Sequence, residues 1–411
     1  MAQLPGVYFT INTENLGRLE PDADTVAGLV LGNITGLGAL PNLAEKTIYS
    51  LKQAEDLGLT KTYDETNAVA AWIHIADFFR KNPNGELHVL TLDAPPTFND
   101  VLHASTGAAL AFIRNANGRI KQLGVVLNNP SLHATFMANI ATHIATAQDF
   151  CRTLEAEYKW LDVVFFEGLG FDIASGSLPN LRAADRPNVS VVLGNDKTWQ
   201  TIDANYEGTS AIGEVLGSST GKPIHDSFAE AKESNTLTDV ADSRFLDVRI
   251  KLTDPDSYTQ DEDAKAVLNE KGFVFPRQYA LRSGWYWTQS QNCSLTTSDL
   301  SSIEMVQVIN KAQRVLYNTL VPYINKTFNI TAAGRLAFLD RKLAEDDVRN
   351  QLEANMADNY SQLVAVIVDP EKDENNQPYP SIQIDNTLRV FVGIRAKGKT
   401  IYIQVNVGYV A

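Results

Sequence analysis

Residues 26–33, VAGLVLGN, form a continuous apolar run that ends on glycine and asparagine. Four later segments have the same form: ELHVLTLD at 86–93, QLGVVLNN at 122–129, DVVFFEG at 162–168 and NVSVVLGN at 188–195. A strand with one exposed face alternates apolar and polar residues, whereas a strand covered on both faces is apolar throughout. These segments therefore predict parallel strands that are buried on both sides.

Between these runs lie four amphipathic segments, at residues 43–58, 67–82, 100–116 and 136–159. In the second segment one helical face carries Val69, Trp72, Ile73, Ala76 and Phe79. Strands that alternate with helices imply right-handed βαβ crossovers. We therefore predict an open, mainly parallel, doubly wound α/β domain.

The rest of the chain differs in composition and in its pattern of apolar residues. Residues 198–263 are rich in Gly and Ser and end in an acidic loop, which indicates a domain boundary or an insertion. A long helix at 299–325, a charged helix at 339–358 and a strand at 363–370 predict an α+β region. With 411 residues, two or three domains are expected. The predicted division is an N-terminal arm at 1–21, the α/β domain at 22–200, a linker or insertion at 201–263, the C-terminal α+β region at 264–387 and a terminal hairpin at 388–411.

Both ends of the chain have the alternating pattern of strands with one buried face. Near the C-terminus two such runs flank a Lys-Gly-Lys turn and predict a β-hairpin arm. The N-terminal arm, LPGVYFTIN, alternates in the same way after a Pro-Gly breaker. Either arm could pair within its own subunit or add a strand to a neighbouring subunit, and ten extended residues reach about 33 Å. The residues predicted for inter-subunit pairing are Val7, Tyr8, Phe9, Ile11, Leu388, Val390, Val392, Ile401, Ile403, Val405 and Val407.

Composition excludes several classes of function. The formal net charge of −14 argues against sequence-independent nucleic-acid binding, which needs a basic surface. No apolar run reaches the roughly 20 residues of a membrane helix, so no membrane insertion is expected. The start, MAQLPGVYF, lacks the basic and apolar regions of a secretory signal, so we expect folding in a cytoplasm. Cys151 and Cys293 are expected to be buried free thiols.

Polar residues follow the predicted strands at the rim where doubly wound sheets bind ligands: Asn33, Asp93, Asn128, Glu167 and Asp196. They could serve acid–base chemistry in an enzyme or a nucleotide-binding protein. Alternatively, Asp and Asn stand there as turn and cap residues. No phosphate-binding loop, histidine pair or nucleophile motif accompanies them, and GSSTGKP at 217–223 has the wrong spacing for a phosphate loop. We therefore predict no catalytic, cofactor-binding or metal residues and no enzyme activity.

The opening LPGVYFTIN resembles the P-G-V-Y start of contractile phage tail sheath proteins, including the sheaths of related contractile injection systems. Residues 28–60 and 68–92 resemble the first strand, loop, helix and second strand of that family. Weaker similarity continues through SGWYWTQSQNC at 283–293 to TIYIQVNVGYV at 400–410. Residues 198–263 have no clear counterpart. The resemblance thus extends over most of the chain, as patterns of residue class.

This resemblance implies a structural subunit that polymerises as stacked hexameric rings around an inner tail tube and contracts to drive the tube through a target envelope. The arms would complete a sheet in neighbouring subunits. The implied partners are other copies, the inner tube protein, and baseplate and tail-terminator proteins, with assembly in the bacterial cytoplasm into a virion tail or an injection particle. No cofactor is implied. The charged helix offers possible tube-facing residues, Glu345, Asp346, Asp347 and Arg349, although a solvated helix face fits the same pattern.

Overall fold

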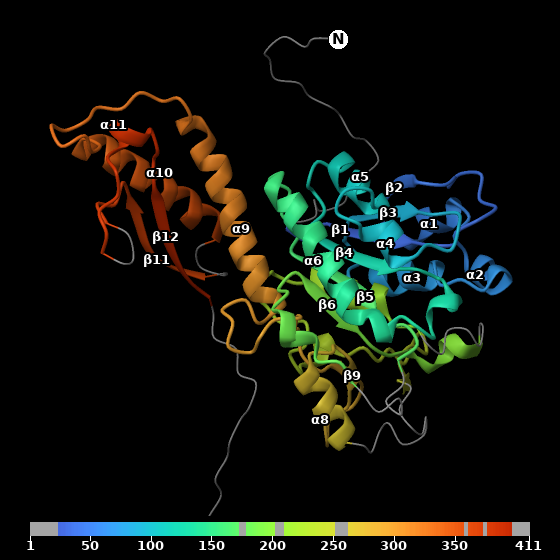
Figure 1. Cartoon of the computed structure of the whole chain (residues 1–411). Coiled ribbons are helices and arrows are strands. Elements are labelled where there is room, and N and C mark those ends of the chain that lie inside the picture. The colour runs from blue at the N-terminus through green and yellow to red at the C-terminus, as the bar shows by residue number, and fades with distance from the viewer. Residues whose placement is uncertain are drawn as a thin grey trace, which may run out of the picture.

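The computed structural model describes residues 24–171, 178–201, 209–250, 262–356, 361–372 and 376–396. A six-stranded sheet lies at the centre of the larger body, with strand order β2-β3-β1-β4-β5-β6 (Figure 1). Its strands are β1 (Ala27–Leu31), β2 (Ala44–Ile48), β3 (Leu87–Thr91), β4 (Gln122–Val126), β5 (Val163–Glu167) and β6 (Val189–Val192). All neighbours are parallel except β2, which is antiparallel to β3. The predicted mainly parallel α/β domain is confirmed.

Helices cover both faces of this sheet, and two glycines show how closely they approach. A Cβ at Gly28 of β1 would lie 3.2 Å from Phe112 of α5 (Ala108–Asn115). A Cβ at Gly124 of β4 would lie 2.8 Å from Ile212 of α7 (Ile212–Thr220). Gly28 and Gly124 are one register step apart on neighbouring strands, so their side-chain positions point to opposite faces. The helices α5 and α7 therefore lie on opposite sides of the sheet.

Two of the predicted helices are wrong in part. Within 43–58, residues 44–48 form the edge strand β2, and the helix α1 (Leu51–Asp56) begins only after the N-cap Ser50. Within 100–116 two short helices occur, α4 (Phe98–Leu102) and α5, separated by a turn. An edge strand with polar residues in its middle carries the same residue types as the first turn of a surface helix, so local pattern does not separate the two.

The segment expected to be a linker contains a helix of the core. The helix α7 packs against α3 (Trp72–Lys81), and a Cβ at Gly213 would lie 1.9 Å from the backbone oxygen of His74. The backbone N–H of Gly213 donates to Nδ1 of His74 at 3.1 Å. The small residues of this segment therefore serve close helix packing, because only glycine fits at such a contact.

The remaining elements complete the larger body. They are α2 (Lys61–Asn67), α6 (Ile140–Ala156), β7 (Asn195–Asp196), β8 (Val248–Arg249), α8 (Glu262–Lys271), β9 (Pro276–Arg277) and β10 (Tyr286–Trp287). Short 3-10 turns occur at Pro130–Leu132, Met137–Asn139, Leu181–Ala184, Lys197–Thr201 and Glu233–Asn235. Buried residues from Val26 to Ile303 form one hydrophobic core, which includes Trp199, Trp285 and Trp287.

The C-terminal unit is an α+β layer pair with a core of its own. It contains α9 (Ile303–Leu320), the 3-10 turn η8 (Val321–Tyr323), α10 (Phe338–Met356), β11 (Ser361–Val368), α11 (Ile382–Asp385) and β12 (Val390–Ala396). The strands β11 and β12 are antiparallel. Side chains of α9, α10 and both strands meet in one cluster that includes Val308, Val348 and Val366. Figure 1 shows α9 on the side of this unit that faces the larger body.

Buried charges join α9 to the larger body. The guanidinium of Arg314 donates to Asp162 at 2.9 Å and to Asp24 at 3.1 Å. The ammonium of Lys311 also binds Asp24, and Asn310 donates to Asp162 at 2.9 Å. Asp162 is fully buried at the start of β5. We call this set of side chains the α9 charge cluster.

Within the described residues, no helix is long and apolar enough to cross a membrane.

Candidate functional site

The two asparagines at the rim of the main sheet are turn residues. Asn33 and Asn128 have left-handed backbones, with φ of 57° and 48°. The side chain of Asn128 accepts from the N–H of Ala70 at 2.9 Å and donates to the oxygen of Gly32 at 3.0 Å. Its hydrogen-bonding groups thus bind the loops that follow β1 and precede α3.

The rim carboxylates also bind backbone. Glu167 is 1 % exposed and accepts from the N–H groups of Leu127 at 3.4 Å and Ser210 at 3.2 Å, and its burial raises its pKa to about 8. Asp196 is fully buried and accepts from Thr198 at 3.0 Å and Phe245 at 2.8 Å. Asp93 is exposed. Among the described residues, no group of three His, Cys, Asp or Glu side chains could hold a metal ion. The buried carboxylates of this rim therefore hold loops of their own chain in place.

A different feature of the C-terminal unit is open to partners, namely the free edge of β12. The N–H of Asp369 donates to the oxygen of Arg389 at 2.8 Å, which makes this a hydrogen-bonded pair of the antiparallel ladder. Such pairs alternate along a ladder. The backbone groups of Phe391 therefore point towards β11, whereas those of Val390 and Val392 point away from it. Within the described residues, no other strand pairs with this edge.

The opposite edge of the sheet supports this register. The N–H of Val368, which is paired with Val390 in the ladder, donates to the Glu345 carboxylate at 3.4 Å. It therefore points away from β12, as the alternation requires. The Glu345 side chain thus caps the N–H of Val368 on this edge of β11, whereas the outward groups of Val390 and Val392 form a short template for another strand.

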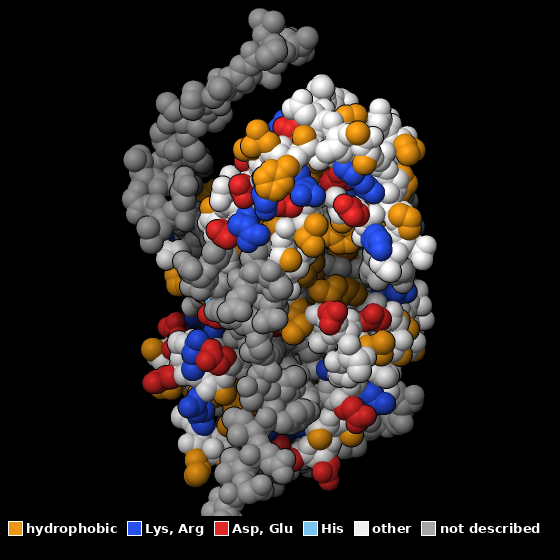
Figure 2. Space-filling view, turned by 90° about the vertical axis from the view of Figure 1, so that its left-hand side faces the viewer, with side chains coloured by type: hydrophobic (Ala, Val, Ile, Leu, Met, Phe, Trp, Pro, Cys, Tyr) orange, Lys and Arg blue, Asp and Glu red, His pale blue; other side chains and the backbone are white. Residues whose placement is uncertain are grey.

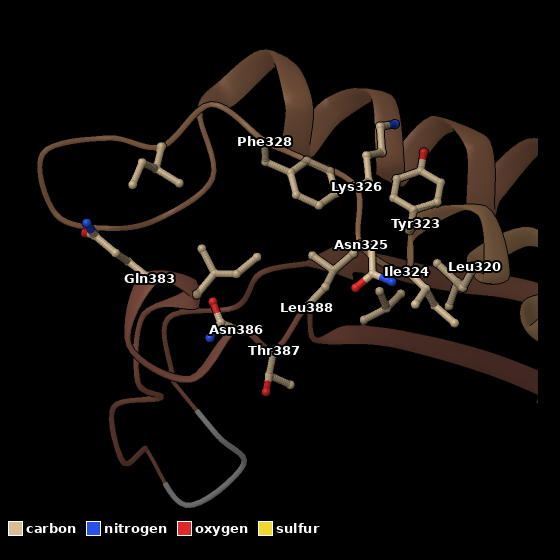
Figure 3. A pocket seen from close by; sticks show the side chains of 13 residues that line it. Leu320, Tyr323, Ile324, Asn325, Lys326, Phe328, Gln383, Asn386, Thr387 and Leu388 are labelled. Atoms are coloured by element: carbon tan, nitrogen blue, oxygen red, sulfur yellow. The ribbon is translucent and has the colours of Figure 1, made fainter.

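A groove of about 820 Å³ adjoins the start of β12 (Figure 3). It is lined by the end of α9, by η8 and the loop after it, by α11, and by the residues leading into β12. Its apolar lining includes Leu320, Tyr323, Phe328, Ile382, Leu388 and Val390. Figure 3 shows Phe328, Lys326 and Tyr323 side by side along one wall. The groove has room for several side chains, and its apolar lining is interspersed with polar residues such as Asn325, Lys326 and Asn386.

A cation lies over the two aromatic rings of that wall. The Lys326 ammonium lies 4.2 Å from the ring centroid of Tyr323 and 5.6 Å from that of Phe328. The two rings are stacked with centroids 6.0 Å apart. The Tyr323 hydroxyl donates to Asp347, and burial together with this carboxylate raises the pKa of Tyr323 to about 12. The wall is therefore built before any partner arrives.

The outer face of the β11–β12 sheet carries two exposed apolar side chains. Ile367 and Phe391 are cross-strand partners, and they are 48 % and 44 % exposed. Figure 2 shows the side of the molecule on which the C-terminal unit lies, where hydrophobic side chains are scattered between charged ones. A two-stranded sheet is only marginally stable alone, and exposed apolar residues on it favour further contacts.

The four possible tube-facing residues on α10 have different environments. Glu345 is half-buried and bound to β11 and to Lys342 at 2.7 Å. Asp347 accepts from Tyr323. Asp346 is exposed and Arg349 is half-buried. Of these four residues, Glu345 and Asp347 are thus bound to groups of their own subunit.

The structure places three of the residues predicted for strand pairing. Leu388 and Val390 line the groove, and Val392 follows on the free edge of β12. The other eight, Val7, Tyr8, Phe9, Ile11, Ile401, Ile403, Val405 and Val407, lie outside the described residues. Sequence reasoning missed the groove wall, although the segment YINKTF at 323–328 places two aromatics around a lysine directly after a long helix.

Comparisons with known proteins agree with this architecture. A family model described as DUF2586, N-terminal domain, matches residues 4–291. A chain of the anti-feeding prophage helical sheath in its contracted state is 15 % identical, with a TM-score of 0.59 and 99 % of each chain covered. A chain of the six-fold symmetrised anti-feeding prophage baseplate is 14 % identical, with a TM-score of 0.59, covering 100 % of this chain and 99 % of that one. No curated protein sequence matches this chain. At these identities the likeness shows the fold, and at that level the predicted resemblance to sheath proteins is confirmed.

Proposed function

The chain belongs to the DUF2586 family, and we propose that it is the structural subunit of a contractile tail sheath. Subunits would stack as hexameric rings around an inner tube, and contraction would drive the tube through a target envelope. The observation that carries this proposal is the open edge of β12 beside an apolar groove, in a fold that aligns with a helical sheath chain over 99 % of both chains.

The edge offers a physical means of joining subunits. A strand added to β12 would pair with the outward backbone groups of Val390 and Val392. Each hydrogen bond contributes about 0.5–1.5 kcal/mol net. Side chains of the added strand that enter the groove contribute more, about 1.5–3 kcal/mol for each large apolar side chain that becomes fully buried. Backbone pairing of this kind tolerates rotation of whole subunits, because the connections are extended chain.

We propose that the N-terminal arm, residues 1–21, and the hairpin arm, residues 388–411, make these connections between subunits, with β12 of the hairpin arm paired to β11 of its own subunit and its outer edge offered to a neighbour. The α/β domain at 22–200, the core helix α7 from the segment 201–263 and the C-terminal region at 264–387 would form the body of each subunit. Further partners would be the inner tube protein and the baseplate and tail-terminator proteins. The particle would assemble in a bacterial cytoplasm as a virion tail or an injection machine.

The outer face of α10 is proposed to meet the inner tube. Since Glu345 and Asp347 are engaged within the subunit, the exposed Asp346 is the member of the predicted set best placed for a partner. The exposed Leu339 and Leu343 precede it at helical spacing, with exposed fractions of 68 % and 53 %.

A role as an enzyme is the alternative, and the rim geometry does not favour it. Both buried rim carboxylates, Glu167 and Asp196, bind backbone N–H groups of their own chain. We propose that the protein has no catalytic site and needs no cofactor.

A proline pair tests the assembly edge. The Val392→Pro variant removes an outward N–H, so the β11–β12 ladder should survive while strand addition is blocked. The Phe391→Pro variant is the matched control, because it removes an N–H that binds β11 and should unfold the C-terminal unit. Sedimentation and negative-stain microscopy should show tubes for the parent protein and soluble, folded subunits for Val392→Pro.

Deletions of residues 1–15 and 400–411 should likewise abolish tubes while leaving a soluble body. A parent protein that stays monomeric at all concentrations and salts would contradict the sheath proposal. Tubes that persist in Val392→Pro and in both deletions would show that subunits join elsewhere.

A further inference from the structure

The described part of the chain starts against α9. Asp24 is the first described residue, and its carboxylate binds Lys311 and Arg314 of that helix. Both cations are largely buried, with side chains 11 % and 12 % exposed. The point at which the arm starts is therefore held on the helix that joins the two units.

The groove lies further along the same helix. Leu320 at the end of α9 and Tyr323 in η8 line it. From Arg314 these residues are six and nine positions onward, which is about 9–14 Å of helical rise. The start of the arm and the groove thus share one rigid element and are separated by a short distance along it.

The arm is long enough to cross this distance within one chain. Twelve residues, 12–23, separate Ile11 from Asp24, and an extended chain of that length spans up to about 40 Å. The segment that would enter the groove carries no charge, since residues 1–13 contain no Asp, Glu, Lys or Arg. Its row of Val7, Phe9 and Ile11 matches an apolar groove beside a strand edge.

We infer that in the unassembled subunit residues 7–11 of the same chain occupy the groove and pair with the free edge of β12. Exchange of this segment for that of a neighbour during polymerisation rests on the proposed sheath function; the contact within one chain does not. A tether of twelve residues gives an effective concentration in the millimolar range. The arm of the same chain therefore outcompetes the arms of other copies in dilute solution.

Such a contact would prevent premature assembly. It covers the exposed strand edge and the apolar groove, which are the features that promote aggregation. In a growing tube, each arm pairs with the same set of groups in a second copy, so the exchange itself loses no pairing. The other contacts of the neighbouring subunit then make the exchanged state favourable. The groove would thus bind an uncharged segment of its own chain, residues 7–11, added as a strand to β12.

Hydrogen exchange of single amides tests this directly. Full-length protein is diluted below the concentration at which it sediments as a polymer, and exchange is measured at Val390 and Val392, whose N–H groups point outward. Phe391 is an internal reference, because its N–H binds β11 in every variant. We expect exchange at Val390 and Val392 to be at least ten-fold faster in the variant that lacks residues 1–15, with no change at Phe391.

A charge scan of the arm is the matched comparison. Phe9→Asp places a carboxylate on the row that enters the groove, whereas Thr10→Asp places it on the opposite row. The first should accelerate exchange like the deletion, and the second should leave it unchanged. A peptide of residues 1–15 added to the deletion variant should restore protection.

Three results would overturn the inference. Equal exchange in the full-length and deleted proteins would show that the arm does not cover the edge. Protection that weakens on dilution would show pairing between copies. Protection lost on deletion of residues 400–411, and kept on deletion of 1–15, would assign the groove to the C-terminal tail. Sedimentation at high concentration tests polymerisation independently of amide exchange. If tubes form but Val390 and Val392 are not protected in dilute solution, this inference is refuted and the sheath proposal stands.

Discussion

Replacement of Arg314 by methionine should destabilise the protein strongly, because the guanidinium neutralises a fully buried carboxylate. Arg314 donates to Asp162 at 2.9 Å, and Asp162 is 0 % exposed. In the variant this carboxylate would retain the hydrogen bond from Asn310 at 2.9 Å, with no directly bound cation replacing the guanidinium. Removal of one partner from a buried ion pair costs about 3–5 kcal/mol.

The expected shift in thermal midpoint follows from the size of the chain. Unfolding entropy of about 2.1 cal/mol/K per residue gives about 0.9 kcal/mol per degree for 411 residues, so the midpoint should fall by about 3–6 °C. Scanning calorimetry would measure this. The control is Arg152→Met, which removes an exposed pair with Asp149 at 3.3 Å and should change stability by less than about 1 kcal/mol.

Two further measurements identify the cause. Burial raises the pKa of Asp162, and Arg314 lowers it. Loss of Arg314 therefore raises the folded-state pKa further above the unfolded value, so the stability deficit of the variant should grow as the pH rises and shrink as the pH falls. The double variant Arg314→Met/Asp162→Asn should recover most of the loss. A loss below about 1 kcal/mol in the single variant, or no recovery in the double variant, would refute the assignment of an energetic role to the α9 charge cluster.

Two other outcomes are expected. Gly213→Ala should lower the free energy of unfolding by more than about 1 kcal/mol, since the added Cβ would meet the backbone oxygen of His74 at 1.9 Å, whereas Gly38→Ala, where nothing lies within 4 Å, should be nearly neutral in denaturant titrations. Glu167 has a folded pKa of about 8, above its ordinary value of 4.5, so its contribution to stability is complete below pH 4.5 and is lost as the pH rises towards 8. Unfolding titrations from pH 5 to 8 should show this decline in the parent protein and a flatter profile in Glu167→Gln; parallel profiles would contradict the buried, protonated state.

Local sequence determined the central sheet, because a strand buried on both faces must be apolar throughout, and that property is written into residues 26–33, 86–93, 122–129, 162–168 and 188–195. Residue type indicated the turn role of the rim asparagines, one of two alternatives in the sequence, and Asn33 and Asn128 adopt left-handed backbones that asparagine tolerates. The sequence also located the alternating run at 388–394, which overlaps most of β12 (Val390–Ala396).

Tertiary structure decided the features that depend on residues far apart in the chain. The strand β2 is defined by its pairing with β3, about 40 residues later, and its own residues do not distinguish it from a helix. The role of α7 depends on Gly213 meeting His74, which no local pattern reports. The groove is assembled from residues 320–330 and 382–390, and the outward direction of Val390 and Val392 is set by the register with β11. Periodicity shows which face of an element is apolar; only the pairing of distant segments decides what that face, and each backbone hydrogen-bonding group, will meet.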